Sequence, residues 1–405
     1  MTRHTEPVEP VSGAPRAGSG RSRPPLLSRG FVLLTAGQFL QSIGYATLPL
    51  LPLYLAWLGA SRVEIGIATG IGSAGGLLVR PWVGVALDRY GRRPVLLLGA
   101  AMLSVAVASV AMVQQVGWFL YLDRILYGVG IGCLFTGYFA FLSDLIPAER
   151  RTEGIALFGV AGLLPLVVSP VSYRLGLSGQ ELRWVFPVAG ALVLASAACV
   201  WAIREPARPA VSGPPAGALD MGRALIQRSL WSVWLATMAF ATMVAVYFSF
   251  STVTATERGV ESATDLWFAY AFGSVSVRLV GSRLPDLVGA RNLVAPSTAL
   301  YVVALLLAAG GQSWSDFMWS GLLAGLGHGY CFPVLMSQVI GRAQADRRGM
   351  ALSVFTALWD VALLGMTPLF GWLSDAMDDA TMFASCALCG CALLAGWFAT
   401  EWNER

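Results

Sequence analysis

The sequence has no lysine, only two histidines and few charged residues of any kind. Its 405 residues carry 27 basic side chains, all of them arginine, and 23 acidic ones, so charged residues make up 12% of the chain. Soluble domains contain about 25% charged residues. Because 56% of the residues are hydrophobic and the mean hydropathy is +0.66, the composition excludes a soluble globular enzyme, a disordered chain and a disulfide scaffold.

The residue types that are scarce also argue against nucleic-acid, nucleotide and metal sites. A net charge of +4 without a long basic stretch does not fit a partner that is a nucleic acid. Without lysine, the chain cannot form the Gly-x-x-x-x-Gly-Lys-Ser/Thr loop that cradles nucleotide phosphates. The run Cys386, Cys389 and Cys391 lies in apolar sequence, with no neighbouring histidine or acid to complete a metal site. We therefore expect no metal, no cofactor and no enzymatic activity.

The hydrophobic residues are gathered in runs of about 20, the length at which an α-helix crosses roughly 30 Å of hydrocarbon. The sequence therefore predicts an all-α protein of the lipid bilayer with twelve transmembrane helices. The expected spans are 31–57, 63–86, 95–115, 118–142, 152–174, 184–203, 229–254, 264–284, 293–311, 316–340, 350–373 and 380–399.

Two polar stretches divide the chain. Residues 1–29 are rich in Pro, Gly, Ser and Arg and lack the apolar core of a signal peptide, so we expect a disordered cytoplasmic tail. Residues 204–228 contain four prolines and four arginines and predict a cytoplasmic linker. These breaks define one six-helix bundle over 30–203, a second over 229–400, and a short cytoplasmic tail over 401–405.

Arginine is distributed unequally between the two sides of the predicted spans. Twenty of the 27 arginines fall on the side of the N-terminus, four fall in the opposite loops, and Arg80, Arg124 and Arg278 lie within spans. Basic residues near span ends are retained in the cytoplasm. We therefore expect a multi-pass protein of the inner (plasma) membrane with both termini cytoplasmic.

The two halves of the chain repeat one another. When the chain is aligned with itself at an offset of 198 residues, Arg80 matches Arg278. At an offset of 197 residues, the sequence of span four matches that of span ten. Duplicated halves are typical of secondary transporters. Further matches at these offsets are Asp88 with Asp286, Gly91 with Gly289, Arg93 with Arg291, Pro170 with Pro368, and 148–151 with 345–348. The repeats predict two bundles related by a pseudo-two-fold axis along the membrane normal.

The loop between spans two and three reads Gly84-Val-Ala-Leu-Asp88-Arg89-Tyr-Gly91-Arg92-Arg93. From about residue 30 onward, the chain resembles the major facilitator superfamily, whose signature loop has this pattern. The resemblance implies a charge network of Asp88, Arg92 and Asp144 that locks the outward-facing state. An alternative is that the arginines only set topology. The expected gate residues are Gly84, Asp88, Arg89, Gly91, Arg92, Arg93 and Asp144, with their repeat counterparts Asp286 and Arg291.

Four ionisable residues within the spans are candidates for proton coupling. The start of span four, Asp123-Arg124, is similar to a motif that the superfamily links to proton transfer, although Arg124 could instead extend toward the outer boundary. His328 and Asp360 lie near the middle of spans ten and eleven, where low polarity favours the neutral form of either side chain. His328 could equally be an uncharged interior residue. Asp360 falls on Leu163 in the other half, so the fold does not require its charge.

The resemblance implies that spans one, four, seven and ten line a central cavity. The candidate substrate-binding residues there are polar or amphipathic: Gln38, Gln41, Tyr45, Tyr138, Tyr247 and Tyr330. Such a lining suits a small amphipathic or aromatic molecule better than a sugar phosphate or a dicarboxylate. The alternative is that each tyrosine serves only helix packing.

We therefore expect a monomeric transporter that works by alternating access. The leading hypothesis is proton-coupled efflux of a small amphipathic organic compound. The alternatives are a proton symporter or uniporter for uptake, and a membrane sensor or scaffold that transports nothing.

Overall fold

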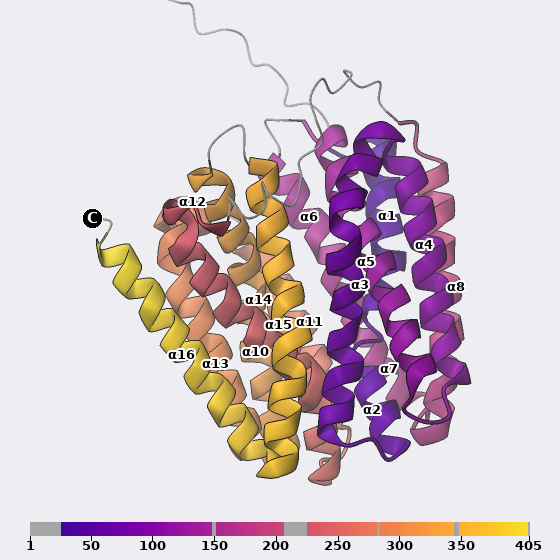
Figure 1. The fold of residues 1–405 in the computed structure, drawn as a ribbon, viewed down its shortest axis with the longest axis vertical. Coiled ribbons are helices and arrows are strands. Elements are labelled where there is room, and N and C mark those ends of the chain that lie inside the picture. Colours follow the sequence, from indigo (N-terminus) through magenta and orange to yellow (C-terminus); the bar gives the residue numbers. More distant parts are fainter. Residues whose placement is uncertain (1–25, 148–150, 206–224, 282–283, 344–347, 404–405) are drawn as a thin grey trace, which may run out of the picture.

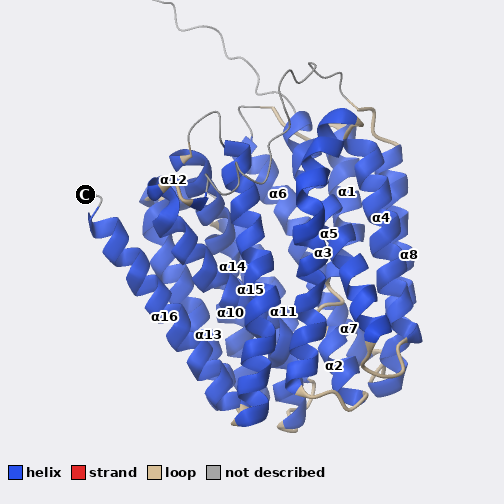
Figure 2. Cartoon of the chain, in the orientation of Figure 1, coloured by secondary structure: helices blue, strands red, loops and turns tan. Residues whose placement is uncertain are grey.

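The computed structural model describes residues 26–147, 151–205, 225–281, 284–343 and 348–403. Within these ranges every regular element is a helix, and the long helices form two groups (Figures 1 and 2). The first group contains α1 (Arg29–Tyr45), α2 (Leu50–Trp57), α3 (Arg62–Arg89), α4 (Arg92–Ser109), α5 (Trp118–Leu145), α6 (Arg151–Leu163), α7 (Val168–Arg174) and α8 (Val185–Trp201). The second contains α10 (Trp231–Glu257), α11 (Leu266–Val280), α12 (Leu284–Val288), α13 (Val294–Gly310), α14 (Trp314–Arg342), α15 (Arg348–Ala376) and α16 (Asp379–Asn403).

The twelve-helix prediction is confirmed. Eleven helical segments of the described chain are long and apolar enough to cross a membrane. The twelfth span is α11, which has 15 residues and follows a short 3-10 turn over Ala263–Asp265. The first span consists of α1 and α2 together, and the fifth consists of α6 and α7.

Both interrupted spans break at prolines. Pro49 precedes α2, and Pro165 lies in the 3-10 turn Leu164–Val167 between α6 and α7. Proline lacks the backbone N–H that would continue the helical hydrogen bonds. Leu48 and Leu163, which flank the two breaks, line a central cavity. The irregular backbone therefore lies beside a cavity, where membrane proteins tolerate it.

Side-chain caps define where two of the longest helices begin. Ser61 and Glu64 form a reciprocal capping box at the start of α3: the backbone N–H of Ser61 donates to Glu64 Oε2 at 2.8 Å, and that of Glu64 donates to Ser61 Oγ at 3.3 Å. Ser313 and Asp316 form the same arrangement at the start of α14. Each box satisfies backbone donors at a helix N-terminus, and both lie at the predicted outer side of the protein.

The two bundles meet most closely where α3 packs along α15 (Figure 1). A Cβ atom at Gly66 of α3 would lie 2.4 Å from the carbonyl oxygen of Thr367, and one at Gly371 of α15 would lie 2.4 Å from that of Arg62. Only glycine permits this backbone approach. A second contact between bundles joins α6 and α11.

The last helix continues further than the sequence predicts. Helix α16 runs to Asn403, so Glu401 belongs to its last turns and is buried, whereas we expected residues 401–405 to form a tail. The physical reason is that arginines from other spans pair with Glu401, as described below. A prediction based on runs of apolar residues cannot detect such partners.

Candidate functional site

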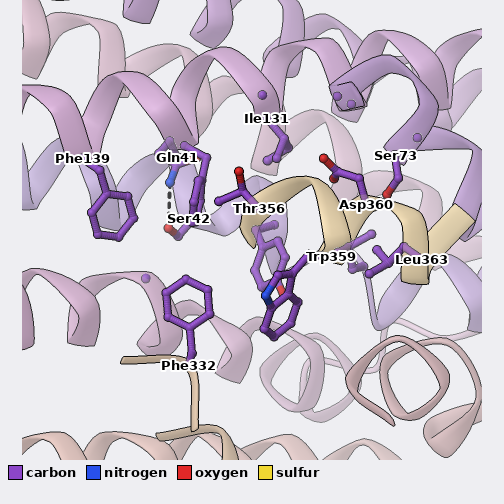
Figure 3. A pocket seen from close by; sticks show the side chains of 18 of the residues that line it. Gln41, Ser42, Ser73, Ile131, Phe139, Phe332, Thr356, Trp359, Asp360 and Leu363 are labelled. Carbon is purple, nitrogen blue, oxygen red and sulfur yellow. Dashed lines mark hydrogen bonds between the residues drawn. The ribbon is translucent and has the colours of Figure 1, made fainter. Parts of the chain in front are cut away.

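A cavity of about 250 Å³ lies between the two bundles. Its mostly apolar walls come from α1, α3, α5 and α6 of the first bundle and α11, α14 and α15 of the second. Figure 3 shows Gln41 and Ser42 of α1, and Trp359 and Asp360 of α15, among the side chains that surround it. This volume lies just below the range of about 300 to 1,000 Å³ that is common for ligand sites. The cavity therefore suits a ligand at the small end of that range.

Asp360 is paired with Arg80 across the cavity. Nε of Arg80 donates to Oδ2 of Asp360 at 2.7 Å, and Nη2 contacts the same oxygen. Arg80 also donates from Nη1 to Oγ1 of Thr356 at 2.7 Å and from Nη2 to the Thr356 carbonyl oxygen at 3.2 Å. Since α3 and α15 belong to different bundles, this pair links the two halves of the protein within the cavity.

Arg278, the repeat counterpart of Arg80, lines the same cavity from α11. A Cβ atom at Gly159 of α6 would lie 2.2 Å from Nη1 of Arg278, so the guanidinium occupies the space above that glycine. Within the described ranges Arg278 has no hydrogen-bond acceptor and no acidic partner, and its Nε atom is buried. The two counterparts therefore share a position and differ in their partners.

Three of the predicted substrate-binding residues line the cavity from α1. Gln41 donates from Nε2 to Oε1 of Gln38 at 3.0 Å and to Oγ of Ser42 at 2.9 Å. Tyr45 also lines the cavity, with its ring centroid 5.9 Å from that of Phe248 in the second bundle. This polar strip faces an otherwise apolar space.

The other three lie outside the cavity lining in this conformation. Tyr138 is buried beside Phe158, with ring centroids 6.1 Å apart. Tyr247 is buried and shares a hydrogen bond of 3.1 Å with Ser320. The hydroxyl of Tyr330 lies against Gly281. These three residues do not line the cavity in this conformation, so their role in substrate binding stays a prediction.

His328 lines the cavity but is held by aromatic neighbours. Its Nδ1 atom shares a hydrogen bond with the Tyr270 hydroxyl, and its ring stacks on Trp359 with centroids 6.1 Å apart. Phe240 packs edge-on at 5.5 Å. This surrounding suits a neutral imidazole.

Asp123 and Arg124 form a buried pair away from the cavity. Nη2 of Arg124 lies 2.6 Å from Oδ2 of Asp123, and both side chains are 3% exposed. Arg124 also donates to the carbonyl oxygen of Ala106 near the end of α4, and Ser109 donates to Asp123 at 2.5 Å. Tyr127 connects this pair to the cavity: it belongs to the cavity lining, and the Arg124 guanidinium lies 4.6 Å from its ring centroid.

The signature loop brings Arg92 and Asp144 together. Nε of Arg92 lies 3.1 Å from Oδ2 of Asp144, and Nη1 donates to the carbonyl oxygen of Leu87 at 2.9 Å. Gly91 has a φ of +103°, which favours glycine, and Glu205 accepts from the backbone N–H of Arg92 at 2.6 Å. The side chain of Asp88 lies outside the described residues. Because α4 and α5 belong to one bundle, the Arg92–Asp144 pair does not itself join the two bundles.

Of the remaining loop residues, Gly84 and Arg89 lie at the surface and Arg93 is half-buried. A Cβ atom at Gly84 would meet no atom within 4 Å. Arg89 is exposed, with its guanidinium 5.6 Å from the ring centroid of Tyr90. Arg93 lies 4.0 Å from the ring centroid of Trp201 and donates to the Trp201 carbonyl oxygen.

The second half has a different charge cluster at the equivalent place. Nε of Arg291 lies 2.7 Å from Oε2 of Glu401, and Nη1 of Arg342 lies 2.5 Å from Oε1. Ser232 also donates to Glu401, at 2.6 Å. The side chain of Asp286 lies outside the described residues. Glu401 therefore joins α16 to the ends of three other spans, through Arg291 before α13, Arg342 of α14 and Ser232 of α10.

An acidic cluster holds Arg62 at the predicted outer side. Its Nη2 lies 2.8 Å from Oε2 of Glu257 and 2.6 Å from Oδ2 of Asp379. Its backbone N–H, with that of Val63, donates to the carboxylate of Asp375 at 2.8 and 2.7 Å. All three acids belong to the second bundle, so they bind the first turn of α3 across the interface.

Sequence reasoning did not select Arg80, Arg278, Glu401 or Arg62 as site residues. A signal existed for the first two, because both are charged residues within spans and both recur at the repeat offset. Glu401 and Arg62 lie at helix ends, where charge is ordinary, and only the packed structure shows their partners. In the described part of the chain, no three His, Cys, Asp or Glu side chains are placed to hold a metal ion.

Comparisons with known proteins agree with this geometry. The family model of the Major Facilitator Superfamily matches residues 34–366. The chain is 27% identical over 331 residues to the multidrug resistance protein MdtL of Escherichia coli O81 (strain ED1a), covering 80% of this chain and 82% of that protein. It is equally identical to MdtL of Klebsiella pneumoniae subsp. pneumoniae, with 77% and 82% covered.

Solved structures share the fold at low sequence identity. The human organic anion transporter MFSD10 (TETRAN) has a TM-score of 0.70 at 18% identity, covering 91% of this chain and 99% of that one. The nucleoside transporter NupG has a TM-score of 0.72 at 13% identity, covering 92% and 99%. With its twelve spans in two bundles around a central cavity, the chain belongs to the Major Facilitator Superfamily.

Proposed function

We propose that this transporter exports a small amphipathic organic compound across the inner membrane by alternating access, driven by protons that move inward. The central cavity is the substrate site, and Asp360 carries the proton. The names of the relatives from Escherichia coli and Klebsiella, which are multidrug resistance proteins, support the direction of transport. One chain supplies every wall of the cavity, so a monomer suffices.

The observation that carries this proposal is the pair of Arg80 and Asp360 inside the cavity. The two side chains are 12% and 17% exposed, and they belong to opposite bundles. A proton on Asp360 removes the negative charge that Arg80 contacts, and breaking one side of a buried ion pair costs about 3 to 5 kcal/mol. The protonation of one residue therefore controls a contact between the two halves of the protein.

The conformation supports a substrate path from the predicted cytoplasmic side. The cavity extends to Arg80 of α3 and Phe139 of α5, both in the halves of those helices that lead to the arginine-rich side. The opposite ends are joined by the cluster around Arg62. In this state Asp360 is paired with Arg80 while the cavity receives substrate.

The remaining predicted residues have roles that follow from their positions. Gln38, Gln41 and Tyr45 orient the substrate along the polar strip of α1. Arg92 and Asp144, which are already paired in this conformation, belong with Asp88 to the proposed cytoplasmic gate. Asp123 and Arg124 stay a second candidate pair for proton transfer.

The test uses everted vesicles that contain the protein and hold an acidic interior. Addition of a transported compound should collapse the pH gradient, recorded by dequenching of an acridine dye. The compounds are 1-naphthylacetate, 1-naphthylacetamide and ethidium, which are anionic, neutral and cationic. Asp360→Asn should abolish the response, and Asp123→Asn is the matched comparison for the second candidate pair.

Two results would contradict the proposal. If Asp360→Asn still collapses the gradient with substrate, Asp360 is not the proton carrier. If substrate leaves everted vesicles instead of entering them, the protein takes up its solute, which is the alternative of symport or uniport. An Arg80→Gln/Asp360→Asn variant removes both charges, and we expect it to fold but to stay uncoupled.

A further inference from the structure

We propose that Arg278 binds the single anionic group of an amphipathic organic anion, so that the substrate is a monoanion such as an aromatic carboxylate. This inference rests on the proposed function, because it names the chemical class of the transported compound. It concerns a residue that the proton-coupling argument does not use.

The internal repeat supplies the first argument. The repeat places Arg80 and Arg278 at equivalent positions, and both line the cavity. Thr356 and Asp360 of the opposite bundle accept the hydrogen bonds of Arg80. At an offset of 197, the positions equivalent to Thr356 and Asp360 are Gly159 and Leu163, which offer no side-chain acceptor. The chain therefore keeps the cation and lacks the counter-ion at this position.

The packing of Arg278 supplies the second argument. Gly159 has no side chain, and a Cβ atom there would lie only 2.2 Å from Nη1 of Arg278, so the guanidinium packs directly against the backbone of α6. Both Gly159 and Leu163 line the cavity with Arg278. Arg278 is half-buried and only its Nε atom is fully enclosed. A guanidinium remains charged at any physiological pH, and a cation without a partner in surroundings of low polarity is costly. A ligand carboxylate that accepts from Arg278 would supply the missing counter-ion.

Other unpaired donors of the lining point the same way. Within the described residues, Nε1 of Trp359 and the hydroxyl of Tyr127 are buried and have no hydrogen-bond partner. Both residues line the cavity. An indole N–H and a guanidinium can only donate. These two donors lie behind the cavity surface, and their unpaired N–H and O–H dipoles add partial positive charge around it, which favours an anionic ligand.

The charge of the lining limits the ligand to one negative group. Among the lining residues, Arg80 and Arg278 are basic and Asp360 is acidic. Asp360 neutralises Arg80, which leaves Arg278 as the single uncompensated charge in that set. The rest of the wall is mostly apolar, with Phe135, Phe139 and Phe332 on it, and accommodates an aromatic or alkyl body.

The test measures equilibrium binding to the purified full-length protein, without any gradient. Radiolabelled 1-naphthylacetate is the probe, and unlabelled 1-naphthylacetamide and 1-(1-naphthyl)ethylamine compete as its neutral and cationic relatives. We expect the carboxylate to bind at least about tenfold more tightly than the amide, the effect of one charge-assisted hydrogen bond. Arg278→Gln should remove this preference, and Arg278→Lys should keep part of it.

A second pair of variants keeps the test valid if Arg278→Gln does not fold. Leu163→Asp recreates the acid that Asp360 provides to Arg80, and Leu163→Asn matches it in size without the charge. We expect the aspartate to abolish the carboxylate preference and the asparagine to retain it. A wild-type protein without a carboxylate preference, or one whose preference survives in Arg278→Gln, would overturn the inference.

The binding assay also separates this inference from the proposed function. A carboxylate preference without any proton flux in vesicles would leave the anion site standing and refute proton coupling. Proton-coupled transport of ethidium or the amide, with no carboxylate preference in binding, would support the proposed function and refute the anion site.

Discussion

Arg62 of α3 and Asp379 of α16 form a two-point ion pair between the bundles at the predicted outer side. Nε of Arg62 donates to Oδ1 of Asp379 at 3.2 Å, and Nη2 donates to Oδ2 at 2.6 Å. The Arg62 side chain is 8% exposed and that of Asp379 is 16% exposed. Paired, bidentate geometry is the strong form of an arginine–carboxylate contact. This contact holds the outer ends of the bundles together in the present conformation.

Arg62→Gln should shift the protein toward the state that is open on the outer side. The substitution removes charge-assisted hydrogen bonds worth about 1.5 to 3 kcal/mol each, so the population ratio should change about tenfold or more. Spin labels report the distance between the bundles on this side, one at Glu181 in the 3-10 turn Gly179–Trp184 and one at Gln312 in the loop before α14. We expect longer distances in the variant.

A control for that measurement is Arg183→Gln, which removes an arginine from the same side of the first bundle. Its guanidinium lies 4.9 Å from the ring centroid of Trp184, a neighbour in sequence, and among the described residues it forms no ion pair or hydrogen bond with the second bundle. Equal distance changes in both variants would show that net charge, and not the pairing of Arg62 with Asp379, sets the outer closure.

Gly371→Ala should impair transport by separating α3 from α15. The added Cβ would lie 2.4 Å from the carbonyl oxygen of Arg62, a backbone atom that cannot swing aside. Gly365→Ala is the matched control on the same helix, because a Cβ there meets nothing within 4 Å. Transport by the two variants is compared in vesicles at equal protein content. Full activity in Gly371→Ala would mean that the helices need not approach this closely.

Glu401→Gln should destabilise the second bundle. The carboxylate bridges Arg291 and Arg342 and accepts from Ser232, so neutralising it weakens three contacts and leaves two cations together. The arginines are 34% and 22% exposed, which screens part of the charge. We expect a loss of about 1.5 to 3 kcal/mol, measured as a lower melting temperature in detergent.

The comparison variant for Glu401 is Glu181→Gln, at an exposed acid whose side chain has no partner among the described residues. It should leave the melting temperature unchanged, since isolated surface charges contribute about 0 to 1 kcal/mol. If Glu401→Gln has the same melting temperature as the wild type, the charge cluster at the end of α16 does not stabilise the protein.

The cavity could be predicted from the sequence only in part. Gln38, Gln41, Tyr45, His328 and Asp360 were selected as polar residues within spans, and all five line the cavity. The rotation of a helix about its own axis decides which of its polar residues face inward, and hydropathy does not report that rotation. For this reason the structure places Tyr138, Tyr247 and Tyr330 outside the lining.

The ion-pair partners of the charged residues were harder to predict from the sequence than the positions of these residues in the spans. The repeat offset aligned Arg80 with Arg278, but nothing in their own neighbourhood shows that one is paired and the other is not. Asp360 lies 280 residues along the chain from Arg80. The ion pair exists because α3 packs along α15, which is a relationship between the two bundles.

The number of spans, the repeat and the family follow from the amino-acid sequence alone, because each rests on local properties: the length of apolar runs, the spacing of glycine and arginine, and a loop signature. The packing of the helices is needed to show which ionisable residues meet in the cavity, which cation lacks a counter-ion, and which end of the protein is closed. These depend on side chains brought together from distant segments, where low polarity makes each pairing or missing partner energetically decisive.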